Sequence, residues 1–135
     1  MKYPVNIEKD GDSFMVSFPD LPEALTCGDT YEESLDMAHD ALITAFDFYF
    51  EDQRPVPMPS NTSKEVVSVP PSVWAKVLLL NTMLETKVTQ SELARRMGTR
   101  KQEVQRIVDL HHSTKIDRLA DALAALHKQF TISIA

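Results

Sequence analysis

Apolar and polar residues alternate near the start of the chain, in two short runs separated by a polar stretch. A period of two is typical of a strand with one buried face, because successive side chains of a strand point to opposite sides. Asp10 and Gly11 stand between the two runs, and an Asp-Gly pair favours a tight turn. The pattern predicts a β-hairpin whose apolar face carries Tyr3, Val5, Ile7, Phe14, Val16 and Phe18.

An amphipathic helix is predicted to follow, from Thr30 to near Gln53. Thr30 can cap its first turn, and Glu33 stands at the position that bonds back to the cap. The aromatic segment 46–50 covers more than one side of this helix, so we expect most of it to lie in the core and some of it to form an interface. Residues at helical spacing should lie over one face of the sheet, namely Leu35, Ala38, Leu42, Ala45, Phe46 and Tyr49.

Prolines divide the chain after this helix. Residues 54–64 contain three prolines, and proline blocks the continuation of a helix. A proline pair at residues 70–71 forms a second break, and residues 65–69 read as a strand that returns to the first domain. We therefore expect one domain over residues 1–69 and a second over residues 70–135.

The second half of the chain reads as helices until its last residues. One helix is expected over residues 72–86 and another over residues 115–127. Their apolar faces consist of Val73, Val77, Leu80 and Leu84 in the first helix, and of Ile116, Leu119, Ala120, Leu123 and Ala124 in the second. Phe130, Ile132 and Ile134 alternate with polar residues, which predicts a C-terminal strand. Such a strand has no partner in its own domain, and an unpaired edge often pairs with a second chain.

Residues 89–110 carry the most specific pattern in the sequence. The pairs Thr89–Glu92 and Thr99–Gln102 both match the capping box that opens a helix. Gly98 lies between them, where a left-handed turn needs a residue without Cβ. Apolar positions fit two helices that cross steeply, with Ala94 at the close contact and with Leu93, Met97, Val104 and Ile107 pointing inward. The pattern predicts a helix-turn-helix.

The outward face of the second of these helices is rich in side chains that recognise bases. Arginine and lysine can donate to guanine, and glutamine can bond to adenine in the major groove. We expect DNA contacts from Arg100, Lys101, Gln102, Gln105 and Arg106, with Gln90 of the preceding helix placed near a phosphate. The alternative is an ordinary pair of helices with a solvated basic face, and the combined pattern favours DNA binding.

The net charge of −6 conceals a difference between the two halves of the chain. Residues 1–60 hold three basic and thirteen acidic residues, a net charge of −10. Residues 61–135 hold eleven basic and seven acidic residues, a net charge of +4. An acidic module joined to a basic one indicates two kinds of partner, a cationic protein for the first and nucleic acid for the second.

The composition indicates in which part of the cell the protein is expected. The 135 residues include no apolar run long enough to span a membrane, and the first residues lack the apolar core of a signal peptide. A single cysteine cannot form an intramolecular disulfide. We therefore expect a cytoplasmic protein that does not contact the membrane.

No constellation typical of catalysis is found in the sequence. Acidic residues such as Asp10 and Asp36 are expected on solvated surfaces rather than at a two-metal site. His39 and the pair at residues 111–112 lack a second ligand at a recognisable metal spacing. Cys27 has no neighbouring base to activate it. The expectation is a protein that is not an enzyme and that has no catalytic residue, no metal and no cofactor.

The N-terminal residues also resemble a known family. Pro19-Asp20-Leu21-Pro22, followed by Thr26, Gly28-Asp29-Thr30 and Glu33, is similar to the hallmark of the HicB antitoxin family. Longer members of that family continue with a helix-turn-helix, so the resemblance covers essentially the whole chain. Residues 23–24 depart from the pattern, because many members carry a glycine there.

The resemblance implies a fold and a function. The fold class is α+β, with a partial RNase H-like β-β-β-α-β domain before an all-α, repressor-like helix-turn-helix domain that ends in the predicted strand. One implied partner is a HicA toxin, a small basic ribonuclease that cleaves mRNA and that the antitoxin neutralises. The other is the operator DNA of the shared operon, which the antitoxin represses. We expect toxin contacts from the turn and from the start of the acidic helix, through Asp20, Leu21, Pro22, Glu23, Glu32 and Glu33.

Two other functions stay open on the sequence alone. One is a metal-dependent nuclease that uses the acidic half, with the second domain delivering it to DNA. The other is a lone transcriptional regulator whose first domain senses a small molecule. For the antitoxin hypothesis we expect a homodimer or a higher homo-oligomer, because one helix-turn-helix reads only a few base pairs.

Overall fold

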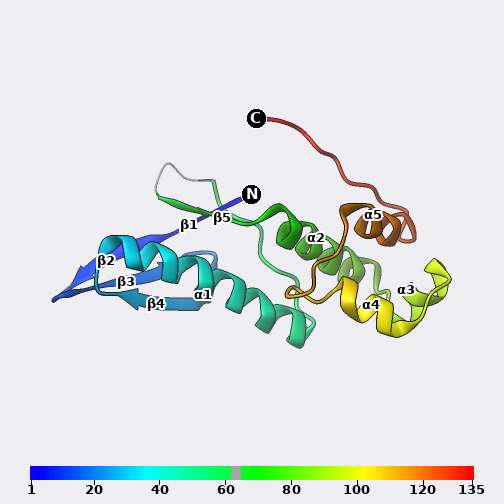
Figure 1. Cartoon of the computed structure of the whole chain (residues 1–135), viewed down its shortest axis with the longest axis horizontal. Helices are drawn as coiled ribbons and strands as arrows, with labels where there is room; N and C mark the ends of the chain where they lie inside the picture. Colours follow the sequence, from blue (N-terminus) through cyan, green and yellow to red (C-terminus); the bar gives the residue numbers. More distant parts are fainter. Residues whose placement is uncertain (62–64) are drawn as a thin grey trace. The chain divides into compact units, whose positions relative to one another are not determined.

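A computed structural model describes residues 1–61 and 65–135 of the chain (Figure 1). These residues form two compact units, Met1–Pro70 and Pro71–Ala135. Strands lie in the first unit and most helices in the second, so the chain is mixed α and β, as expected. Among the described residues, no helix is both long and apolar enough to cross a membrane.

An antiparallel sheet with the strand order β2-β3-β4 forms the base of the first unit. Its strands are β2 (Asn6–Asp10), β3 (Ser13–Phe18) and β4 (Leu21–Gly28). Asp10 pairs with Ser13 across the tight turn, where Gly11 has a φ of 60°. The hairpin predicted from the alternating pattern is confirmed.

The predicted first strand is divided in the structure. Its beginning is β1 (Lys2–Pro4), which pairs antiparallel with β5 (Val66–Ser68) instead of with β3. The division falls at Val5, whose N–H bonds to the carbonyl of Glu65 at 2.9 Å. The strand expected to return at residues 65–69 is therefore present. It explains the division, because two different strands pair with successive parts of one extended segment.

Helix α1 (Tyr31–Asp52) covers one face of the three-stranded sheet and packs mainly on β4 (Figure 1). The Thr30 hydroxyl accepts the N–H of Glu33 at 3.0 Å, as the capping pattern predicts. The helix ends at Gln53, which takes a left-handed conformation and donates its N–H to Phe50 and Tyr49. Buried side chains form the predicted stripe, except that Leu35 is only half-buried and Ser34 is fully buried.

Gly28 allows this close packing of helix on strand. A Cβ atom at Gly28 would lie 2.6 Å from the nitrogen and 2.8 Å from the Cα of Ser34. Both are backbone atoms of the first helical turn, so neither can move aside without displacing α1. Gly28 is therefore required, because any side chain at this position would clash with the backbone of α1.

Much of the proline-containing segment packs onto the first unit instead of forming a free linker. Val56 is buried, and the Tyr3 hydroxyl donates to the carbonyl of Pro57 at 2.7 Å. The carboxylate of Asp20 accepts the N–H of Ser60 at 2.8 Å and also accepts its hydroxyl. Residues 62–64, the end of the predicted break, lie outside the described residues.

Four helices build the second unit around one apolar core. They are α2 (Pro71–Thr86), α3 (Gln90–Met97), α4 (Lys101–Ile107) and α5 (Ile116–Ala124). Thr89 accepts the N–H of Glu92 at 3.1 Å, and Gly98 ends α3 with a φ of 65°. The predicted inward positions of α3 and α4 are buried, apart from half-buried Met97. The core consists of Ala75, Leu79, Met83, Val88, Leu93, Ala94, Val104, Ile107, Leu119, Ala122, Leu123 and Leu126.

Several local details of the second unit were predicted wrongly. Arg100, not Thr99, occupies the cap position of α4, and no side chain caps that helix. In α2, Val77 and Leu80 of the predicted face are buried, but Val73 and Leu84 are only half-buried. The residues that join the helical core, Ala75, Leu79 and Met83, were not assigned from the sequence. In the last helix, Ile116 is 49% exposed, because the core-facing residues there are Leu119, Ala122 and Leu123.

The predicted C-terminal strand is also wrong for this single chain. Residues 128–135 form no strand, and Ile132 and Ile134 are 81% and 99% exposed. Phe130 instead packs against the core of the second unit. A strand needs a neighbouring strand to bond to, and within the described residues no strand pairs with this tail.

Lys76 is the buried charge of the second unit. Its side chain is 2% exposed, and its ammonium group donates to the carbonyls of Arg106 at 3.2 Å, Asp109 at 2.5 Å and His112 at 2.6 Å. These carbonyls lie at the end of α4 and in the loop after it, and those of Arg106 and Asp109 also accept the backbone N–H groups of Asp109 and His112. Burial lowers the pKa of Lys76, while the Asp109 carboxylate opposes this change. The interaction fastens the end of α4 to α2.

We predict that Lys76→Met lowers the free energy of unfolding of the second unit by about 2–4 kcal/mol, because three hydrogen bonds from a charged donor are lost. Chemical denaturation of the full chain, followed by helical circular dichroism, measures the change. Lys128→Met, at an exposed position, is the matched control and should change stability by less than about 0.5 kcal/mol. A Lys76→Met variant as stable as the wild type would contradict this role.

Candidate functional site

The side chains predicted to contact DNA gather at the start and along the outer face of α4. Lys101, Gln102, Gln105 and Arg106 are all exposed, and so is Arg100 at the cap position. Val104 and Ile107 point into the core from the same helix. Because the buried residues fix the rotation of α4, the basic and amide side chains are held on its solvent side.

One acidic side chain, that of Glu103, lies within this basic surface. The Arg106 guanidinium lies 3.8 Å from the carboxylate of Glu103, which also lies 3.6 Å from Arg118. Exposed pairs of this kind are weak, so a phosphate can displace Glu103 from Arg106. Gln90 is half-buried in the first turn of α3.

Two further arginines of α3 are already engaged within the unit. Glu92 accepts Arg95 Nε at 2.8 Å and Arg96 Nε at 3.0 Å, and these bonds lower the pKa of Glu92 to about 2. Arg96 also donates to the carbonyl of Ala125 at 3.3 Å, just after α5. Arg96 therefore links α3 to the end of α5.

The residues predicted to contact the toxin divide between structural and exposed positions. Leu21 is fully buried, so its side chain stabilises the start of β4. Asp20 is half-buried and holds Ser60. Pro22 and Glu23 are exposed, and Glu32 and Glu33 are exposed in the first turn of α1.

Glu23 links the start of β4 to the end of α1. Its carboxylate accepts the Tyr49 hydroxyl at 2.8 Å and lies 3.4 Å from the guanidinium of Arg54. That guanidinium stacks over the Tyr49 ring, 4.3 Å from its centroid. The Tyr49 bond and, to a smaller extent, Arg54 lower the pKa of Glu23.

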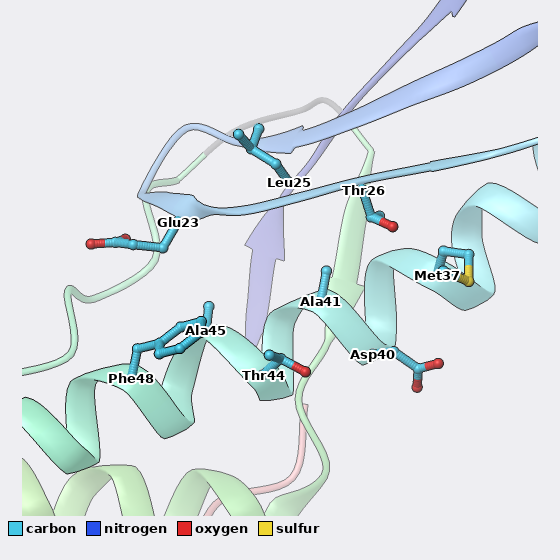
Figure 2. A pocket seen from close by; sticks show the side chains of 9 residues that line it. All are labelled: Glu23, Leu25, Thr26, Met37, Asp40, Ala41, Thr44, Ala45 and Phe48. Atoms are coloured by element: carbon cyan, nitrogen blue, oxygen red, sulfur yellow. The ribbon is translucent and has the colours of Figure 1, made fainter.

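A groove with a volume of about 320 Å³ lies between β4 and α1 (Figure 2). Figure 2 shows Thr26 pointing toward the helix and Leu25 pointing away from it. The helix contributes both apolar and acidic side chains. The lining residues are Glu23, Leu25, Thr26, Met37, Asp40, Ala41, Thr44, Ala45 and Phe48.

Sequence reasoning missed both this groove and Lys76. A signal for Lys76 exists, because it stands three, four and seven residues before the buried Leu79, Leu80 and Met83. A signal for the groove is the apolar pair Met37 and Phe48, which lies beside the core stripe of α1 at helical spacing. Both signals become meaningful only when the packing partner of each helix face is known.

Three carboxylates of the first unit each contact a different residue and do not converge on one site. Asp20 bonds Ser60, Glu23 bonds Tyr49, and Asp52 pairs with Arg54 at 3.3 Å. Within residues 1–61 and 65–135, no three His, Cys, Asp or Glu side chains gather in a way that could hold a metal ion. Cys27 is exposed on β4.

Comparison with known proteins gives consistent results along the chain. The profile of a family described as HicB_like antitoxin of bacterial toxin-antitoxin system matches residues 2–78. Antitoxin HicB 2 of Photorhabdus laumondii is 61% identical over 132 residues, covering 98% of this chain and 95% of that protein. Antitoxin HicB of Escherichia coli is 50% identical over 135 residues, covering 98% of each. Antitoxin HicB of Pseudomonas fluorescens is 37% identical over 136 residues, covering 98% of this chain and 93% of that protein.

We predict that Tyr49→Phe raises the pKa of Glu23 toward its ordinary value of 4.5, because the carboxylate loses its main donor. A lowered carboxyl pKa stabilises the folded state above the unfolded pKa, and this contribution is lost as the pH falls through the folded pKa. The variant should therefore lose about 1 kcal/mol near neutral pH and less at acid pH.

An NMR titration of the Glu23 carboxyl and urea unfolding at two pH values measure these changes. Tyr31→Phe is the matched control, since the Tyr31 hydroxyl donates to Glu65 instead. The control should leave the Glu23 titration as it is in the wild type. An unchanged Glu23 titration in Tyr49→Phe would refute the proposed cause.

Proposed function

The chain belongs to the HicB-like antitoxin family, and from this premise we propose that it neutralises a basic mRNA-cleaving toxin and represses its own operon. Toxin binding is assigned to residues 1–69 and operator binding to residues 70–135. The observation that carries this division is the opposite charge of the two parts, together with the full-length similarity to proteins named antitoxin HicB. The cytoplasm, where both mRNA and operon lie, is the proposed location.

The first unit supports toxin binding by its charge and its surface. Helix α1 contains seven acidic residues and no lysine or arginine. An acidic surface attracts a basic ribonuclease and speeds the encounter between them. We assign this unit a partial RNase H-like fold used as a scaffold, because Asp20, Glu23 and Asp52 serve separate structural contacts.

The second unit supports operator binding by its geometry. Helix α3, a short turn containing Gly98, and α4 follow one another in the order of a helix-turn-helix. Residues at the start of a recognition helix enter the major groove deepest. We therefore assign base contacts to Arg100, Lys101, Gln102 and Gln105, and phosphate contacts to Arg106 and Gln90.

We predict that Gln102→Ala or Gln105→Ala weakens binding to the preferred operator by about 1–3 kcal/mol and flattens the preference among bases. Arg106→Ala should weaken binding to all sequences alike. It should lower the slope of log affinity against log salt by roughly 0.9 per half-site, because it removes one phosphate contact. Operator titrations at two salt concentrations measure both effects.

The same variants test the division of function when each is co-expressed with the toxin encoded beside this chain. The wild type and all three variants should restore growth, because the toxin site is assigned to the other unit. Lys128→Ala serves as the surface control in both assays. A wild-type chain that does not restore growth would overturn toxin neutralisation. An unchanged base preference in both glutamine variants would show that residues outside α4 make the base contacts.

We further propose that the protein acts as a homodimer or higher homo-oligomer through its exposed tail. Removing residues 131–135 should convert the dimer into a monomer, since this removes Ile132 and Ile134 but keeps Phe130 on the core. It should also weaken binding to a palindromic operator with half-sites about 34 Å apart. Sedimentation and operator titration of the shortened chain measure this. A dimer that persists would place the interface elsewhere.

A further inference from the structure

The groove between β4 and α1 exposes large apolar side chains among acidic ones (Figure 2). Met37 and Phe48 are 38% and 48% exposed, and Asp40 lies between them along the helix. Glu23 adds a second carboxylate from the strand. Apolar surface rimmed by charge is typical of a site that another protein covers.

The charge on α1 points to the nature of that protein. Glu51 and Asp52 lie in the last turn, where the helix dipole disfavours negative charge, and the turn has no basic residue. Arg54 neutralises Asp52 in part, at 3.3 Å. The helix therefore carries negative charge that does not stabilise it, and a cationic partner would offset that charge.

The backbone of β4 offers a second mode of contact. β4 ends the strand order β2-β3-β4, so within the described residues no strand pairs with its outer side. No residue of β2 or β3 lines the groove, which places the groove on this free side. An edge strand of eight residues is a template to which an extended segment can add.

We propose that this groove is the docking site for an extended segment of the basic toxin. The segment adds to β4 as a strand, places an apolar side chain between Met37 and Phe48, and brings lysine or arginine to Glu23 and Asp40. The inference rests on the proposed toxin binding and names the surface that performs it. Only Glu23 is shared with the contacts expected from the sequence.

Another copy of this chain is a weaker candidate for the same groove. The first sixty residues carry a net charge of −10, so two such surfaces repel each other. The exposed tail of a second copy, residues 131–135, is apolar but contains no lysine or arginine. It could pair with the β4 backbone but would bring no cation to Asp40.

The test measures the affinity of the full chain for the purified toxin encoded beside it. Phe48→Ser and Asp40→Lys are each expected to weaken binding about tenfold or more. Thr44→Arg is a third variant, because Thr44 is exposed and arginine suits a helix, so the fold is retained while the groove is filled. Unfolding midpoints and operator affinity of the variants should match those of the wild type.

Matched controls lie elsewhere on the same sheet. Met15→Ser removes an apolar side chain that is 44% exposed on β3, and Glu8→Lys makes the same charge change on β2. Both should bind the toxin within about twofold of the wild type. Hydrogen exchange should show new protection of the β4 amides when toxin is added.

The outcomes separate the inference from the function on which it rests. A wild-type chain that does not bind the toxin overturns the proposed function. Toxin binding that is unchanged in Phe48→Ser, Asp40→Lys and Thr44→Arg overturns only the proposal that the groove is the docking site. Protection of β4 that grows with the concentration of the chain alone would assign the groove to a second copy instead.

Discussion

The ammonium group of Lys76 decides how α4 is presented. It donates to the carbonyls of Arg106, Asp109 and His112, at the end of α4 and in the loop after it. Because Lys76 belongs to α2, these bonds join α2 to the helix with the exposed basic face. Apolar packing of Val104 and Ile107 sets the rotation of α4, and Lys76 holds its end.

The first unit depends on a different constraint, the close packing of α1 on β4. Gly28 admits the start of the helix at a distance that a Cβ atom would prevent. At the other end, the bond from Tyr49 to Glu23 ties the helix to the beginning of the strand. Fixed at both ends, the pair forms a groove between β4, whose outer side pairs with no strand of the described residues, and a face of α1 that exposes Met37, Asp40 and Phe48.

The two units place opposite charges on surfaces with different physical demands. A basic helix face with amide side chains suits the phosphates and base edges of DNA, where charge supplies affinity and hydrogen bonds supply specificity. An acidic groove with exposed apolar side chains suits a cationic protein, where burial of apolar surface adds to electrostatic attraction. Joining the two in one chain allows one protein to couple a toxin to its own operator, which is the function proposed for it.

The sequence by itself determined the elements whose signals are local. The turn at Gly11, the caps at Thr30 and Thr89, and the left-handed Gly98 each involve residues within a few positions of one another, so spacing was enough to predict them. The exposed residues of α4 followed from the same helical period.

Tertiary structure decided what depends on distant partners. Lys76 bonds to residues 30 to 36 positions away, Val5 marks a change of strand partner, and the groove needs β4 beside α1. The cap of α4 was predicted wrongly, and the core residues Ala75, Leu79 and Met83 of α2 were missed, because helix packing, not local propensity, sets them. The predicted terminal strand did not form, and within the described residues no strand pairs with residues 131–135.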